Sequence, residues 1–191
     1  MLRCAIVDRG YVSRAATLWA KAGLDFVQLR DKTLASGELS LLARSILDDL
    51  ARVPGSKTQL LVNSNTEVAI EAGAAGVHLT SNAGENAAAR VRQAFRLAER
   101  PDPVIGISCH TLAEVDHARD AGVSFILFGP VFEKRVQGEL VSPGTGLERL
   151  REACLAAGTT PVLALGGVTC ENSDDCVRAG AAGVAGIRLF A

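Results

Sequence analysis

The sequence lacks a surplus of charge and a long apolar run, and each absence excludes a class of protein. The formal net charge over the 191 residues is −1. A chain so close to neutral lacks the broad basic surface that nucleic acids or anionic membranes require. No apolar run reaches the length of a membrane span, and the N-terminal segment MLRCAIVDRG lacks the apolar core of a signal peptide. We therefore expect a cytoplasmic protein with no nucleic-acid or membrane partner.

The sequence also lacks paired cysteine motifs. It holds five cysteines, an odd number, with no C-x-x-C pair and no spacing typical of a zinc finger. We expect free thiols in a reducing compartment and no cysteine-bound metal.

A repeated Ala-Gly pair, followed almost at once by an apolar run, is the most regular feature of the chain. The pairs are Ala22-Gly23, Ala72-Gly73, Ala121-Gly122 and Ala179-Gly180. Glycine just past the end of a helix is a common left-handed cap, so each pair predicts a helix that stops before a short strand. A length of 191 residues fits a single domain, which we expect to span 1–191.

Short apolar runs predict the strands, and segments with helical spacing lie between them. The strands are expected near 2–7, 25–30, 59–63, 76–79, 103–107, 123–128, 161–166 and 183–187. The helices are expected near 12–22, 37–52, 65–72, 85–98, 112–121, 145–157 and 171–179.

This alternation favours an α/β fold, a single-domain (β/α)8 TIM barrel, over the alternative of an open doubly wound sheet. The sequence ends at Ala191, just after the last expected strand, so an eighth helix is expected to be truncated or absent. An uncovered flank between the first and seventh helices would favour a homodimer.

One connection, 129–146, shows no clear periodicity. Its sequence, GPVFEKRVQGELVSPGTG, holds four glycines, two prolines and the basic pair Lys134-Arg135. It follows the sixth expected strand at the face where such barrels place their chemistry, so we interpret it as an active-site lid rather than a plain surface loop.

Polar residues at the carboxyl ends of the strands are the candidates for a site, because barrel enzymes react at that face. In the segment DFVQLRDKT, polar Gln28, Arg30 and Lys32 stand at every second position and apolar Val27 and Leu29 take the other parity, as expected where alternate side chains point into the barrel mouth. Two cations there, joined by Lys134 or Arg135 if the lid closes, suit a phosphate or diphosphate. A second anion site is expected at Gly166-Gly167 and near the last strand.

The histidines leave alternatives open. His78 could line the mouth or be a packed core residue, and His117 is expected on the surface. His110 follows Cys109, but adjacent residues point apart, so a Cys-His nucleophile pair is not favoured.

With these elements in order, the chain resembles the thiamin phosphate synthase/TenI superfamily over essentially its full length. The matching segments, in order, are VQLRDK (27–32), LLVNS (60–64), AGAAGVHLT (72–80), IGISCHT (105–111), FGPVF (128–132), GTGLERL (144–150) and PVLALGGVT (161–169).

The resemblance implies thiamin biosynthesis: coupling of hydroxymethylpyrimidine diphosphate to thiazole phosphate, with release of diphosphate. It implies that Gln28, Arg30, Lys32 and Asn63 hold the pyrimidine diphosphate and that Ser108 lies near the pyrimidine. It also implies that Gly166, Gly167 and the backbone around Ile187 hold the thiazole phosphate. Magnesium is the expected cofactor of the family.

Several positions depart from the family pattern. The Asn-Asp pair after the third strand reads Asn63-Ser64, and Gly-Gln-x-Asp after the fourth strand reads Thr80-Ser81-Asn82-Ala83. Two carboxylates that would bind magnesium are therefore missing, and no residue here is predicted to be a metal ligand. The family's lid sequence Thr-x-Thr-Lys reads Lys-Arg-Val-Gln at 134–137. The positive charge is kept, but the pattern of residues is not.

The resemblance leaves three functions to weigh. A synthase is the first, because Pro130 and the residues of 28–32 follow that branch. A TenI-like tautomerase is the second, although its histidine is replaced by Pro130. The third is a non-catalytic binding or regulatory protein that keeps the anion site.

Overall fold

Parallel strands close into a barrel in the computed structural model, which describes residues 1–136, 139–187 and 189–190. The barrel strands are β1 (Leu2–Val7), β2 (Phe26–Leu29), β3 (Gln59–Asn63), β4 (Gly76–Leu79), β5 (Val104–Cys109), β6 (Phe125–Phe128), β9 (Val162–Leu165) and β10 (Gly183–Gly186). Their order around the barrel is β1-β10-β9-β6-β5-β4-β3-β2, and every neighbouring pair is parallel. The expected barrel is confirmed, and the open-sheet alternative is wrong.

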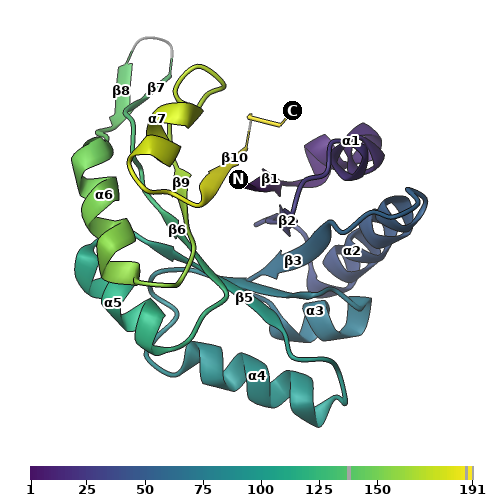
Figure 1. Ribbon diagram of the computed structural model, residues 1–191. Helices are drawn as coiled ribbons and strands as arrows, with labels where there is room; N and C mark the ends of the chain where they lie inside the picture. The colour runs from purple at the N-terminus through teal and green to yellow at the C-terminus, as the bar shows by residue number, and fades with distance from the viewer. Residues whose placement is uncertain (137–138, 188, 191) are drawn as a thin grey trace.

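Helices surround the barrel as an outer arc (Figure 1). They are α1 (Arg9–Lys21), α2 (Ser36–Ala51), α3 (Thr66–Ala72), α4 (Ala87–Leu97), α5 (Leu112–Asp120), α6 (Gly146–Ala157) and α7 (Ser173–Arg178). The expected bounds are confirmed to within three residues at each end. None of these helices is long and apolar enough to cross a bilayer, within the part of the chain that the structure describes.

The Ala-Gly pairs end helices as expected. Gly23, Gly73, Gly122 and Gly180 all have positive φ values, of 67°, 84°, 64° and 108°. Glycine has no Cβ, so it turns the chain at these angles without strain, and a strand follows within a few residues each time.

The arc of helices is open between α7 and α1, and the C-terminal residues lie in that gap (Figure 1). The indole Nε1 of Trp19, on α1, donates to the carbonyl oxygen of Phe190 over 3.0 Å. Leu189 and Phe190 pack against the core, and the described residues after β10 form no helix. The expectation that an eighth helix is absent agrees with the described residues.

The segment between β6 and α6 differs from its expected irregular form. It contains a two-stranded antiparallel hairpin of β7 (Lys134–Val136) and β8 (Glu139–Ser142), separate from the barrel sheet. These strands were not predicted, because the glycines and prolines on either side leave too few residues for an alternation of apolar and polar side chains to be recognised. Residues 137 and 138 lie outside the described residues.

Alternate strand residues form two apolar layers. Val27, Leu60, Val77, Ile126 and Ala164 point outward and pack under the helices. Inward-pointing residues fill the barrel below its mouth: Cys4, Ile6, Leu61, Phe125, Leu127, Leu163 and Ala185. Since an eight-stranded barrel is only just wide enough for its own side chains, its interior has little spare space.

Gly106 of β5 provides that space at one level of the barrel. A Cβ placed on it would stand 2.5 Å from Cζ of Phe125 and 2.6 Å from Nδ1 of His78. Both neighbours are buried, with 1% of their surface exposed. Neither ring can move without disturbing the layer around it.

We therefore expect Gly106→Ala to lower the free energy of unfolding by about 1–3 kcal/mol, the usual cost of overpacking a core. Urea unfolding followed by circular dichroism measures this. Gly37→Ala is the matched control, because Gly37 lies in α2 with nothing within 4 Å of an added Cβ. Its stability should be unchanged or slightly higher, since alanine favours helix more than glycine does. Equal effects of the two changes would contradict this account of the barrel interior.

Candidate active site

A layer of polar side chains lies inside the barrel, between the apolar filling and the mouth. Gln28 of β2 donates from Nε2 to Oδ1 of Asn63 on β3 over 2.8 Å. His78 of β4 and Ser108 of β5 are joined by a 2.9 Å hydrogen bond between Nε2 and Oγ. In the strand register, Asn63 lies two residues beyond the partner of Gln28, and Ser108 lies two residues beyond the partner of His78. Each bond thus joins a deeper side chain to one nearer the mouth on the next strand.

The two pairs are buried to different degrees. Gln28 is 2% exposed and His78 is 1% exposed, whereas Asn63 and Ser108 are half-buried and reach the mouth. Oε1 of Gln28, like Nδ1 of His78, is buried and makes no hydrogen bond. Buried polar atoms are normally paired, so this oxygen is suited to accept a hydrogen bond from a ligand.

Arg30 and Lys32 lie beyond the end of β2, because that strand stops at Leu29. The N–H of Arg30 still donates to the carbonyl oxygen of Val7, which continues the ladder by one residue. Lys32 is exposed in the loop that follows. The expectation that one strand carries all three polar residues is therefore wrong, since the strand orients only Gln28.

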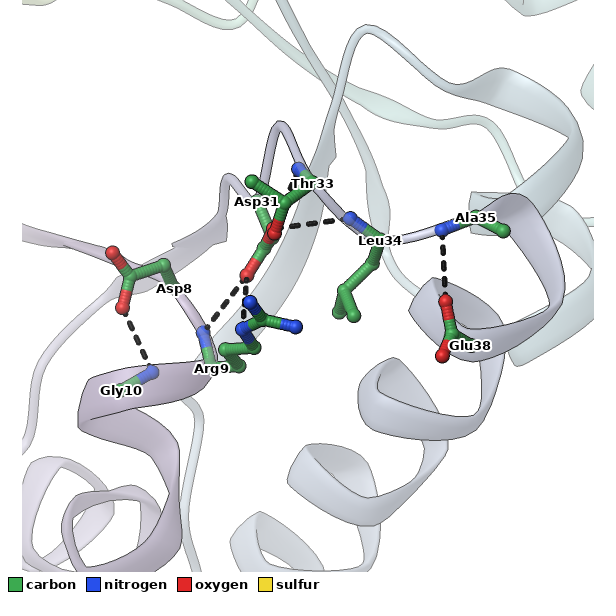
Figure 2. A network of polar contacts seen from close by, with 8 residues as sticks. All are labelled: Asp8, Arg9, Gly10, Asp31, Thr33, Leu34, Ala35 and Glu38. Atoms are coloured by element: carbon green, nitrogen blue, oxygen red, sulfur yellow. Dashed lines mark hydrogen bonds and ion pairs between the residues drawn. The ribbon is translucent and has the colours of Figure 1, made fainter.

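Asp31, between these cations, binds the loop rather than the cations. Its Oδ1 accepts from N–H and Oγ1 of Thr33 and from N–H of Leu34, over 2.8, 2.6 and 3.2 Å. Its Oδ2 lies 3.8 Å from Nε of Arg9, which follows β1 (Figure 2). These bonds, those from Thr33 first, lower the pKa of Asp31 to about 2.

Asp31 thus joins the loops after β1 and β2 and keeps its charge at neutral pH. Asp8 is used similarly, because its Oδ1 accepts from the N–H of Gly10 at the start of α1 (Figure 2). The spacing of Asp31 and Thr33 is that of an Asx turn, a signal that could have predicted this role.

Because Asp8 and Asp31 are engaged elsewhere, neither leaves the two cations at the mouth with an acidic partner. Arg30 and Lys32 form no ion pair within the part of the chain that the structure describes. Arg30 is half-buried, and its charge reaches inward, where it contributes to the low pKa of His78. Two unpaired cations beside a polar layer can hold an anionic group of a ligand.

The ends of β9 and β10 lie on the other side of the mouth. Leu165 pairs with Ala185, so continuing that register sets Gly167 beside Ile187. Gly166 and Gly167 have φ values of 92° and 65°. Beyond the ladder of β9 and β10, the N–H groups of Gly167 and Val168 donate to no backbone acceptor among the described residues. Free N–H groups on a left-handed turn are suited to bind an anion.

These glycines also have a packing role. A Cβ on Gly166 would stand 2.6 Å from Cα of Pro130, and one on Gly167 would stand 2.7 Å from Cβ of Phe132. The chain leading into the hairpin therefore fits against them. The backbone of Lys134 begins β7 in that hairpin, while its side chain lies outside the described part of the structure.

The remaining histidine and cysteine candidates have structural roles. Nδ1 of His110 lies 2.5 Å from the carbonyl oxygen of Gly129, which ties the end of β5 to the chain after β6. Burial, with the charge of Glu114, raises the pKa of the Cys109 thiol to about 12. Cys109 is buried and His110 is bonded to Gly129, so the structure gives no support to a Cys109-His110 nucleophile pair. His117 is exposed, as expected.

The positions after β3 and β4 do not fit a magnesium ion held by this chain. Nδ2 of Asn63 donates to Oγ of Ser64 over 3.2 Å, and Thr80 donates to Oδ1 of Asn82 over 2.7 Å. Ala83 packs against the core. Among the described residues, no group of three or more His, Cys, Asp or Glu could hold a metal ion. Magnesium needs carboxylate oxygens, and these positions offer only amides and hydroxyls.

Comparison with known proteins identifies the family. The model of the thiamine monophosphate synthase family matches residues 4–190. The thiamine-phosphate synthase of Neisseria meningitidis serogroup B is 37% identical over 174 residues, 88% of this chain and 77% of that protein. The thiamine-phosphate synthase of Methanoculleus marisnigri is 36% identical over 170 residues, 89% of this chain and 75% of that protein.

A solved structure shares the fold. The thiamine phosphate pyrophosphorylase of Pyrococcus furiosus superposes with a TM-score of 0.74 at 23% identity, covering 97% of this chain and 85% of that protein. Together, the family match over nearly the whole chain and the sequence identity to these relatives lead to one conclusion. The chain belongs to the thiamine monophosphate synthase family.

Proposed function

We propose that this protein is a thiamine-phosphate synthase, which joins hydroxymethylpyrimidine diphosphate to thiazole phosphate and releases diphosphate. The observation that carries the proposal is the polar layer of Gln28, Asn63, His78 and Ser108 beneath the unpaired cations Arg30 and Lys32. An aromatic ring with donor and acceptor atoms suits this layer, and a diphosphate suits the cations above it.

In the proposed complex, the pyrimidine lies on the polar layer. Its amino group donates to Oε1 of Gln28, the buried acceptor without a partner. Asn63, held by Gln28, and Ser108 border the ring at the mouth. Arg30 and Lys32 bind the diphosphate oxygens, where charge-assisted hydrogen bonds are strong.

The reaction exchanges a C–O bond for a C–N bond. The bond between the pyrimidine methylene carbon and the diphosphate oxygen breaks, and its electron pair leaves with diphosphate. The resulting cation is stabilised by electron donation from the aminopyrimidine ring, and the thiazole nitrogen then forms the new bond with its lone pair. Arg30 and Lys32 favour this step because they stabilise the charge that develops on the leaving group.

The second substrate is proposed to bind across the mouth. The N–H groups of Gly167 and Val168, on the turn that Gly166 begins, together with the backbone around Ile187, would hold the thiazole phosphate. Lys134, at the start of the hairpin, would add positive charge over the diphosphate. This leaves the thiazole ring facing the methylene carbon.

Assays with the two phosphorylated substrates test the proposal directly. We expect product with these substrates alone or with added magnesium. If no product forms under either condition, the synthase proposal is wrong. Binding of thiazole phosphate without turnover would then support a non-catalytic binding protein, and isomerisation of a thiazole carboxylate phosphate would support a tautomerase.

Arg30→Ala tests the cation site. A charge-assisted hydrogen bond contributes about 1.5–3 kcal/mol, so we expect kcat/KM for the pyrimidine diphosphate to fall about 10- to 100-fold. Arg96→Ala is the control, because Arg96 is an exposed arginine on α4, outside the barrel. Both variants should unfold at the wild-type urea concentration. An unstable Arg30→Ala protein would mean that Arg30 supports the fold instead.

Ser64→Asp tests the missing carboxylate. Ser64 has a left-handed backbone with a φ of 55°, which aspartate and asparagine tolerate better than most residues. We expect this change to increase the stimulation of turnover by magnesium several-fold, since it restores the family's acidic residue. Ser64→Asn has nearly the same shape without the charge and should behave as wild type. Equal magnesium responses of the two variants would contradict the role of this position.

We also propose that two copies associate through the flank between α7 and α1, where no helix covers the barrel among the described residues. Sedimentation velocity tests this, and a monomer at micromolar concentration would contradict it.

For the cellular location, we propose the cytoplasm, because all five cysteines are free and a reducing compartment keeps thiols in that state. Cell fractionation tests the location.

A further inference from the structure

His78 is a buried histidine whose two ring nitrogens have different surroundings. Nε2 lies 2.9 Å from Oγ of Ser108, while Nδ1 has no hydrogen-bond partner. The side chain is 1% exposed, so water does not reach the ring freely. The ring therefore has one polar contact.

The side of the ring that carries Nδ1 faces carbon atoms. Both Nδ1 of His78 and Cζ of Phe125 lie close to the position where Gly106 would carry a Cβ. The His78 and Phe125 ring centroids are 6.1 Å apart, with the planes tilted by 34°. Neither neighbour offers a side-chain acceptor to an N–H at Nδ1.

His78 is neutral at neutral pH. Burial first, and then the positive charge of Arg30, lower its pKa to about 3. A neutral imidazole carries one N–H, either at Nδ1 or at Nε2. The choice between these tautomers decides the direction of the bond to Ser108.

The surroundings favour a proton on Nε2. A proton on Nδ1 would be a buried donor without an acceptor, and such donors are rarer in folded proteins than unpaired acceptors. With the proton on Nε2, that group donates to Oγ of Ser108, and Nδ1 keeps only an unpaired lone pair. The Ser108 hydroxyl then accepts from His78, and its own proton can be donated to another acceptor.

We propose that His78 is a positioning residue whose Nε2–H donates to Ser108, so that the Ser108 hydroxyl donates its own proton to an acceptor atom of the ligand at the barrel mouth. This deepens the proposed function and rests on it for the identity of the ligand, whose acceptor is then a ring nitrogen of the pyrimidine. Ser108 is half-buried at the mouth and has no other described hydrogen-bond partner. The site would thereby prefer a ring nitrogen to a ring C–H at this place.

The tautomer can be measured in the free protein, independently of any activity. Long-range ¹H–¹⁵N correlation spectra separate protonated from unprotonated ring nitrogens, and His78→Gln identifies the signals of His78 among the three histidines. We expect a protonated Nε2 and an unprotonated Nδ1 throughout the roughly neutral range of about pH 6–9. A proton on Nδ1, or protonation of both nitrogens, would overturn the proposal.

Variants test the effect on the ligand. His78→Met removes the donor at similar volume, and Ser108→Ala removes the hydroxyl. Each should lower kcat/KM for the pyrimidine substrate by about tenfold, the usual effect of one hydrogen bond, and leave KM for thiazole phosphate unchanged. The double variant should lose little more than either single one, because both act through the same hydroxyl. Additive losses would overturn the proposal.

His78→Gln provides the rescue, because the Gln amide can also donate to Ser108. It should keep more activity than His78→Met at equal stability in urea. If His78→Gln is as impaired as His78→Met although both fold, the donor has no role and the proposal is wrong. A substrate analogue with C–H in place of the ring nitrogen should bind the wild-type protein about tenfold more weakly than the substrate does. The Ser108→Ala variant should bind the analogue and the substrate equally well. If the wild type gives no product at all, the proposed function fails, while the spectra still decide the tautomer.

Discussion

The narrow interior of the barrel is the constraint on which the site depends. Every second strand residue points inward, and eight parallel strands leave only enough room for their own side chains. The absence of a side chain at Gly106 lets the rings of His78 and Phe125 enter the same level. His78 is thereby held where its Nε2 meets Ser108 on the next strand.

The polar layer above the apolar filling costs more free energy than an apolar layer would. Polar groups cost free energy when buried, and hydrogen bonds between Gln28 and Asn63 and between His78 and Ser108 offset much of that cost. Oε1 of Gln28 remains buried without a partner, which a purely structural layer would avoid. A packed apolar core would need none of these groups.

The charges at the mouth are divided between structure and function. Asp8 and Asp31 accept hydrogen bonds from backbone N–H groups and fix the loops after β1 and β2 (Figure 2). Arg30 and Lys32 are thereby left without acidic partners among the described residues. The chain retains the cations of its family while Ser64 and Ala83 replace the carboxylates, so the electrostatics of this mouth are more positive than the family pattern implies.

Much of the barrel could be predicted from the sequence, because its signals are local. The Ala-Gly helix ends, the apolar runs and the capping pair Thr111-Glu114 all depend on residues within a few positions of one another. The hairpin of β7 and β8 was missed because its strands are short and bounded by turn residues, so they show no period of their own. The strand expected over 25–30 ends one residue earlier, at Leu29, although the N–H of Arg30 still bonds to Val7, so polar residues at every second position did not mark where the strand ends.

The candidate site was only partly predictable, because some of its features are local in the sequence and others are not. The sequence by itself determined which residues lie at this end of the barrel: Gln28, Arg30, Asn63 and Ser108 follow from strand parity and the resemblance. Only the tertiary structure decided their partners. Whether Asp31 binds Arg30 or the loop, and whether His78 packs in the core or meets Ser108, depends on distances between separate strands and loops. Hydrogen bonds act over about 3 Å, so their choice of partner is decided only when the closed barrel brings those atoms together.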